Sequence, residues 1–502
     1  MRGFGIDIDI DIDHHAEGTA LVSPFREERN VSSLNVLDFT IFVKSRPHSL
    51  YAWSMILLSF TVRNHKSIRD EVTVEFARPS LKTLTPKDGN WQAAVYPLTG
   101  IFGSNASGKS TILDALHFAM SAVRLSATQW QRNPGMIRLP FQLDAESQAA
   151  SSTYILDLVH QGHRYEYGFE VDGQGIRQEW LRNVPSSRWR TLLKRDRDSG
   201  ILTFHPSLRT KVEVTARELV LSRALLLENS VLSNFAQAII DHFDVVLVKD
   251  SHRAARLQGI ADSLVEGDIT FDDLESLLQV ADIGVSKVAI EELKVPDNLL
   301  RAIQQFNHEL HQGEMSDEQT SHTSEKGSEV EDIAEHDLEV VVRSLLFTHR
   351  GKQPDTPAFS LDQESDGTIA WLAISVPALQ ALRRGGVLLI DEIDSSLHPH
   401  LLETLLAAFA DPLINTLSAQ LIFTSHDLYV LTPQSQVQLD PHQVWLVDKT
   451  YEGVSELTCL ADFPRHPDAN VARRYLNGRY GGTPRLSPSR FNVLVDSYRG
   501  QD

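Results

Sequence analysis

Nine residues around position 105 combine glycines, a lysine and hydroxyl side chains at a fixed spacing. They read Gly103-Ser104-Asn105-Ala106-Ser107-Gly108-Lys109-Ser110-Thr111 and fit the pattern G-x-x-x-x-G-K-[ST] in full. Glycines let backbone N–H groups turn inward around phosphate oxygens, and a helix N-terminus adds partial positive charge. The pattern therefore predicts an ATP-binding phosphate loop, in which Lys109 reaches the β and γ phosphates and the Ser110 hydroxyl ligates Mg²⁺.

A second acidic motif follows a short apolar run. Asp391 and Glu392 come directly after Val387–Ile390, a predicted buried strand. Phosphoryl transfer needs positioning and charge stabilisation more than covalent help from the protein. We expect Asp391 to hold the Mg²⁺ shell and Glu392 to orient and polarise the attacking water, as in a Walker B motif.

Three further features indicate the ABC type of phosphate-loop protein. Ser365 and Gly367 lie at the start of a predicted helix, 26 residues before Asp391 (391 minus 365), as in an ABC signature motif. Residues 393–398 have the place of a D-loop, and His426 ends a predicted strand, where a switch histidine would contact the γ-phosphate. Together they predict that two heads close around ATP, with Ser365 and Gly367 of one head covering the phosphate held by the other. Gln142 is a candidate Q-loop residue or a surface strand residue.

The flanking patterns predict how these motifs are positioned. Apolar strand-like runs lie at 56–63, 72–76 and 98–102, and further strands at 153–159, 164–171 and 176–181 include an Asp-Gly turn. A helix is expected from Lys109 to about Ala122. We predict an α/β fold of the P-loop NTPase, ABC-ATPase head type: a mixed sheet flanked by helices, an antiparallel β lobe and an inserted helical lobe.

The chain divides into four predicted parts. Residues 1–54 are an N-terminal extension, 55–210 the first half of the head, 211–337 a helical insertion and 338–502 the second half. The insertion is inferred because Lys109 and Asp391 are 282 residues apart (391 minus 109), more than the core of the head needs. Helical spacing at 225–243 and 297–310 lacks the sustained heptads of a coiled coil, so we expect a compact lobe. Its end, 312–337, is polar and acidic and predicts a flexible linker.

Composition narrows the setting of the protein. The 502 residues carry a net charge of −20, which argues against broad electrostatic binding to nucleic acid. The chain has one cysteine, Cys459, which excludes an internal disulfide. No apolar run of membrane-spanning length and no signal peptide is recognisable, so we expect a cytoplasmic location without a membrane partner. The Ile-Asp alternation at 6–13, beside His14 and His15, is either a metal-binding edge or a solvated tail, or translated sequence before a start at Met55.

Beyond the motifs, the chain from about Met55 to Leu486 resembles SMC-like and OLD-like ATPases, and in particular bacterial ABC ATPases of the RloA, PtuA and abortive-infection type. The resemblance implies a defence role, in which the ATPase senses a trigger and controls a separate toxic effector, often a nuclease. OLD-like relatives carry a TOPRIM nuclease domain after the ATPase. Here 76 residues follow His426 (502 minus 426) without a convincing acidic cluster, so we expect an effector in trans. The segments that carry the resemblance are Phe60–Ile68, Glu364–Thr368, Asp391–Asp394, Ser395–Pro399, Thr424–Asp427 and Gly478–Pro484.

Two other functions stay open. An SMC-like ATPase acting directly on DNA would need a basic surface, and a transporter ATPase would need a membrane-domain partner. The acidic balance argues against the first, although six basic residues of the β lobe form either a basic edge or an ordinary solvated rim: Arg182, Arg188, Arg190, Lys194, Arg195 and Arg197.

Overall fold

The computed structural model describes residues 55–208, 212–227, 230–247, 250–281, 284–294, 341–351, 357–395, 397–464 and 470–481. Several sequence predictions lie outside these ranges. They are the extension at 1–54, the helix at 297–310, the linker at 312–337 and the end of the late glycine-rich segment, 482–484.

Lys109, Asp391 and His426 all follow strands of one sheet, which has six strands in the described part of the chain. Every neighbouring pair of strands is parallel except β15 with β16, at one edge of the sheet. Since β14 lies between β3 and β13, the carboxyl ends of the strands that lead into Lys109, His426 and Asp391 meet at one edge. The spatial order is β16 (Ser455–Cys459), β15 (Val444–Lys449), β3 (Leu98–Gly103), β14 (Gln420–Ser425), β13 (Val387–Ile390) and β9 (Phe243–Val246).

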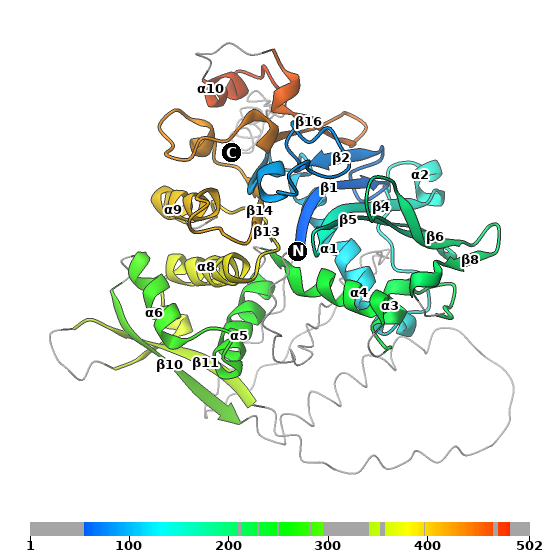
Figure 1. Cartoon of the computed structure of the whole chain (residues 1–502). Coiled ribbons are helices and arrows are strands. Elements are labelled where there is room, and N and C mark those ends of the chain that lie inside the picture. The colour runs from blue at the N-terminus through cyan, green and yellow to red at the C-terminus, as the bar shows by residue number, and fades with distance from the viewer. Residues whose placement is uncertain are drawn as a thin grey trace, which may run out of the picture. The chain divides into compact units, whose positions relative to one another are not determined.

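Helices cover both faces of this sheet. In β13, Val387 and Leu389 pack into the apolar cluster of α1 and α4, whereas Leu388 and Ile390 pack into that of α8 and α9. This alternation is the two-residue period of a strand buried on both faces. Figure 1 shows the two helix pairs on opposite sides of β13 and β14. The helices are α1 (Lys109–Leu125), α4 (Val231–His242), α8 (Asp366–Arg384) and α9 (Pro399–Ala410).

The predicted antiparallel β lobe is a second sheet, with seven described strands. The expected Asp172–Gly175 turn joins β5 to β6, and α1 contacts strands of both sheets. The helix that begins with Lys109 is thus held between them. The strands, in spatial order, are β2 (Val72–Glu75), β1 (Met55–Arg63), β4 (Ser152–His160), β5 (His163–Asp172), β6 (Gly175–Val184), β7 (Arg190–Asp196) and β8 (Ile201–Phe204).

The predicted α/β fold, with its mixed sheet and helices on both faces, is therefore confirmed, but the insertion differs from the expected helical lobe. Strand β9 belongs to the core sheet, and β10 starts a three-stranded antiparallel sheet against which α5 and α6 pack. Val288 and Ile290 of β10 lie toward the apolar cluster of this lobe at strand period. Besides α4 and β9, the described α-helices and strands between residues 211 and 360 are α3 (Val220–Ala224), α5 (Asp250–Glu266), α6 (Phe271–Val280), β10 (Val285–Lys294), β11 (Val341–His349) and β12 (Phe359–Ser360).

Two short helices, α2 (Ala145–Ala149) and α10 (Val471–Leu476), complete the described α-helices. Across the described ranges, no helix combines the length and the apolar character needed to cross a bilayer.

Candidate nucleotide site

The phosphate loop is closely enclosed by the parts of the chain around it. It runs from the end of β3 to the start of α1, with Ala106 and Gly108 at φ values of 64° and 105°. A Cβ built on Gly108 would lie 2.1 Å from Ser455 Oγ and 2.8 Å from Ser67 Oγ. Backbone conformation and close approach therefore both require glycine at this position.

Two serines distant in sequence brace this loop. Ser455 Oγ donates to the Ser107 carbonyl at 2.6 Å and lies 2.8 Å from Ser67 Oγ, which lies 3.0 Å from Thr111 Oγ1. The sequence analysis missed both serines. Ser67 follows β1 and Ser455 begins β16, and a serine at the end of a strand does not indicate which loop it contacts. Ser67 does belong to the segment that carries the family resemblance, which was the available signal.

Lys109, His426 and Glu392 form one chain of hydrogen bonds. The Lys109 ammonium donates to the Gly103 carbonyl at 2.8 Å and lies 3.0 Å from His426 Nδ1. Since an ammonium only donates, Nδ1 accepts, and the Nε2–H of the imidazole is left to donate to Glu392 Oε1 at 3.1 Å. Three predicted site residues, from the loops after β13 and β14 and from the start of α1, are thus brought within hydrogen-bonding distance.

The charge of Lys109 is balanced by the carboxylates around it. Burial lowers the pKa of its ammonium, and the nearby carboxylates of Glu392, Asp391 and Asp394 act in the opposite direction. Lys109 is only 4% exposed, so a phosphate bound beside it would meet a partly desolvated ammonium. There its attraction to an anion is stronger than in bulk water.

Asp391 gathers hydroxyl groups at the end of β13. Its Oδ1 accepts from Ser110 Oγ at 2.8 Å and from Thr424 Oγ1 at 2.6 Å. Hard oxygen atoms of this kind suit Mg²⁺, which takes only one or two protein ligands when it accompanies a nucleotide phosphate. In the described part of the chain no cluster of three His, Cys, Asp or Glu residues forms a metal site of its own. The donor set therefore fits a nucleotide-associated Mg²⁺.

Asp394, in the predicted D-loop, fixes the segment that carries His426. Its carboxylate accepts from the backbone N–H groups of His426 and Asp427, at 3.2 Å each. The loop after β13 thereby fixes the position of the loop after β14. Ser396 of the same D-loop lies outside the described residues.

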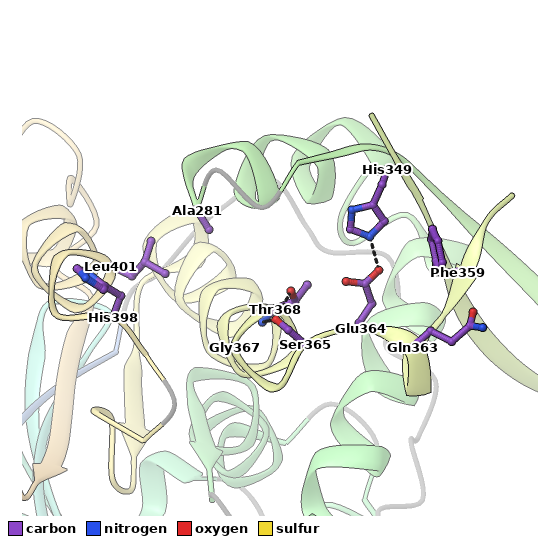
Figure 2. A pocket seen from close by; sticks show the side chains of 10 residues that line it. All are labelled: Ala281, His349, Phe359, Gln363, Glu364, Ser365, Gly367, Thr368, His398 and Leu401. Carbon is purple, nitrogen blue, oxygen red and sulfur yellow. Dashed lines mark hydrogen bonds and ion pairs between the residues drawn. The ribbon is translucent and has the colours of Figure 1, made fainter. Parts of the chain in front are cut away.

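The predicted signature motif lines a separate hollow of about 690 Å³ (Figure 2). Ser365 caps α8 by accepting from the Thr368 N–H at 3.1 Å, and His349 Nε2 lies 2.5 Å from Glu364 Oε1. In Figure 2 the start of α8 lies between His398 and Leu401 on one side and His349 and Phe359 on the other. A 19-residue helix whose N-terminus opens into a hollow is suited to an anion.

The structure does not bring this hollow together with the phosphate loop of the same chain. Of the described residues that line it, none belongs to 103–111. The loop after β13 reaches both places, since Glu392 contacts His426 and His398 lines the hollow. Side chains of Glu392 and His426 remain 42% and 34% exposed, so the phosphate site is open on one side.

Two weaker sequence predictions find their places elsewhere. The Gln142 side chain is exposed and donates to the Pro140 carbonyl at 3.2 Å, a bond within its own loop. In the basic rim, Arg182 is bonded to Glu166, Arg197 to Asp172, and the buried Arg195 to the Glu218 carbonyl. Arg190 also donates to the Asn183 side chain, at 3.2 Å. Four of the six basic residues are thus held by neighbouring strands and loops, which weakens the rim as a surface for nucleic acid.

A family model matches residues 98–432 of this chain and is described as "AAA domain, putative AbiEii toxin, Type IV TA system". The match covers more than half of the 502 residues and includes residues 103–111, Ser365, Asp391, Glu392 and His426. The chain belongs to this family. No curated protein matches it significantly in sequence.

Two solved structures are similar to the chain. One is the SMC head bound to the C-terminal winged-helix domain of ScpA, with 14% identity, a TM-score of 0.39, and coverage of 80% of this chain and 97% of that chain. The other is an SMC head with an extended coiled coil bound to the C-terminal domain of ScpA from Pyrococcus furiosus. It has 12% identity, a TM-score of 0.35, and coverage of 89% and 100%.

Proposed function

We propose that this AAA-family protein binds and hydrolyses ATP, and that two copies close head to head around the nucleotide. The observation that carries the proposal is the bonded chain of Lys109, His426 and Glu392 at the edge of the sheet, beside Asp391 and Ser110. Residues 103–111 wrap the phosphates with backbone N–H groups, and Lys109 neutralises the β and γ oxygens. Glu392 orients the attacking water, and His426 holds that carboxylate in place.

Ser110 and Asp391 would hold Mg²⁺ on the nucleotide. When bound, this ion would offset the negative charge that develops on the transferred phosphoryl group. The protein's contribution is to fix the Asp391 carboxylate, which already receives two hydroxyl hydrogen bonds.

Dimer closure is proposed because each chain has two incomplete halves of a site. Phosphoryl transfer gains most from fixed dipoles in a site that excludes water, yet Glu392 and His426 are partly exposed. The start of α8, with Ser365 and Gly367, has the geometry of an anion site but lies apart from the phosphate loop. A second copy related to the first by a twofold axis would cover the phosphate loop of each chain with the start of α8 of the other and complete two sites by symmetry.

Complementation of two inactive variants tests this arrangement. Lys109→Ala disables the phosphate loop and Ser365→Arg blocks the start of α8, so each variant alone should hydrolyse no ATP. Mixed one to one, they should regain up to about a quarter of the wild-type rate, because half of randomly formed dimers are mixed and each holds one intact site. The control is a mixture of two separate Lys109→Ala preparations, which should stay inactive. An inactive mixture of folded variants that form mixed dimers would refute the shared site.

For the biological role, we propose a cytoplasmic sensor ATPase of a bacterial defence system that controls an effector in trans. The family description names a putative toxin of a toxin–antitoxin system, which supports such a setting. The acidic net charge of −20 favours a protein partner over DNA.

Co-purification checks the biological role. Tagged Glu392→Gln protein, taken from its native host with ATP present, is expected to retain a stoichiometric nuclease-like or toxin-like protein. Lys109→Ala protein purified in parallel serves as the control, since it should not reach the ATP-bound state. Recovery of the protein with DNA alone would contradict the defence proposal and favour an SMC-like role on DNA.

A further inference from the structure

The Thr424 hydroxyl lies between the two carboxylate residues of the phosphate site. Thr424 is fully buried on β14. Its Oγ1 donates to Asp391 Oδ1 at 2.6 Å and accepts from the Glu392 backbone N–H at 2.7 Å. One side-chain oxygen is therefore bonded to both consecutive acidic residues.

Glu392 needs such a contact because of its backbone. It has φ of 51°, in the left-handed region, which is unfavourable for a residue with a Cβ and persists only where neighbouring contacts fix it. The N–H of Glu392 is bonded to Thr424 Oγ1, and the next N–H, that of Ile393, is bonded to the Thr424 carbonyl at 3.0 Å. Thr424 thus fixes the turn that points Glu392 toward His426 instead of along the strand.

We propose that Thr424 is a positioning residue for ATP hydrolysis, whose hydroxyl sets the Asp391 carboxylate for Mg²⁺ and the Glu392 carboxylate for water at the same time. The inference rests on the proposed ATPase function. Among side chains of this size, only the hydroxyl of serine or threonine donates one hydrogen bond and accepts another through the same oxygen atom. Valine has the same shape but neither capacity. Thr424→Val would leave the Glu392 N–H without its partner and remove one of two hydroxyl donors to Asp391.

The test compares Thr424→Val with Thr424→Ser. We expect Thr424→Val to lower kcat ~10- to 100-fold and to raise the Mg²⁺ concentration for half-maximal turnover, the usual cost of losing an outer-shell partner. Affinity for ATP measured in EDTA should stay within about threefold of wild type, because the contacts of Lys109 are intact. Thr424→Ser keeps the hydroxyl and should recover most of kcat. Thr99→Val, at a buried threonine of the neighbouring strand β3 that makes none of the site contacts above, controls for the loss of a buried hydroxyl.

The outcomes separate this inference from the proposed function. If wild-type protein hydrolyses ATP and Thr424→Val matches it in kcat and Mg²⁺ dependence, the inference is overturned and the function stands. If Thr424→Ser is as impaired as Thr424→Val, or Thr99→Val causes the same loss, the effect is one of packing and the inference is again overturned. If wild-type protein neither binds nor hydrolyses ATP, both fall together.

Discussion

Replacing Glu392 with glutamine is expected to lower ATP turnover by ~10²- to 10⁴-fold, the range for loss of a positioned general base, while ATP binding persists. Glutamine has nearly the same shape and its amide oxygen still accepts from His426 Nε2–H, so the hydrogen-bonded chain to Lys109 is kept. It lacks the negative charge that polarises water. With Mg²⁺ and ATP the variant should accumulate as the closed dimer, since the step that reopens it is blocked. Phosphate release and light scattering after size exclusion measure the two effects.

Glu456→Gln provides the matched control for this substitution. Glu456 is an exposed residue of β16 in the same sheet, outside the site contacts. Its replacement should change neither the rate of ATP turnover nor the ATP-dependent formation of the dimer. Wild-type turnover in Glu392→Gln would remove this residue from catalysis. A variant that binds ATP, has lost turnover and stays monomeric would keep the catalytic role but argue against closure.

Lys109→Ala is expected to weaken ATP binding by at least ~100-fold. The ammonium is placed to make two or more charge-assisted hydrogen bonds to phosphate, and each contributes about 1.5–3 kcal/mol. The same substitution takes a cation away from beside Glu392 and His426, so the remaining carboxylates repel the triphosphate. Titration calorimetry with ATP in the presence of Mg²⁺ measures the loss.

Lys194→Ala is the control for that variant, because Lys194 is an exposed lysine of β7 on the β lobe. It should bind ATP as wild type does. Thermal unfolding of both proteins tests whether the fold survives. If folded Lys109→Ala protein bound ATP within about threefold of wild type, the assignment of residues 103–111 as the phosphate loop would be wrong.

Local patterns in the sequence predicted the parts of the site that depend on contiguous residues. The strand expected at 98–102 and the helix from Lys109 match β3 and α1, since an apolar strand, a glycine loop and a helix follow one another without interruption. The same holds for β13 before Asp391 and for the cap of α8 at Ser365.

Contacts between distant segments could not be predicted in this way. Ser67 and Ser455 meet across 388 positions, and a serine after a strand carries no sign of its partner. The arginines of the β lobe formed a basic run in the sequence, but Glu166 and Asp172, the carboxylate partners of Arg182 and Arg197, lie on the earlier strand β5. Strand β10 was missed because its partner β11 follows only at residue 341, so no hairpin pattern marks it.

The order of strands in the core sheet also constrains how the protein folds during synthesis. Strands β4 to β8 pair with close neighbours along the chain, and contacts of this kind form early. Strand β3, by contrast, lies between β14 and β15, and its first partner begins 322 residues later (420 minus 98). The phosphate loop therefore emerges from the ribosome long before the strands that support it. Segments made before β14 therefore fold without the strands that flank β3 in the finished sheet.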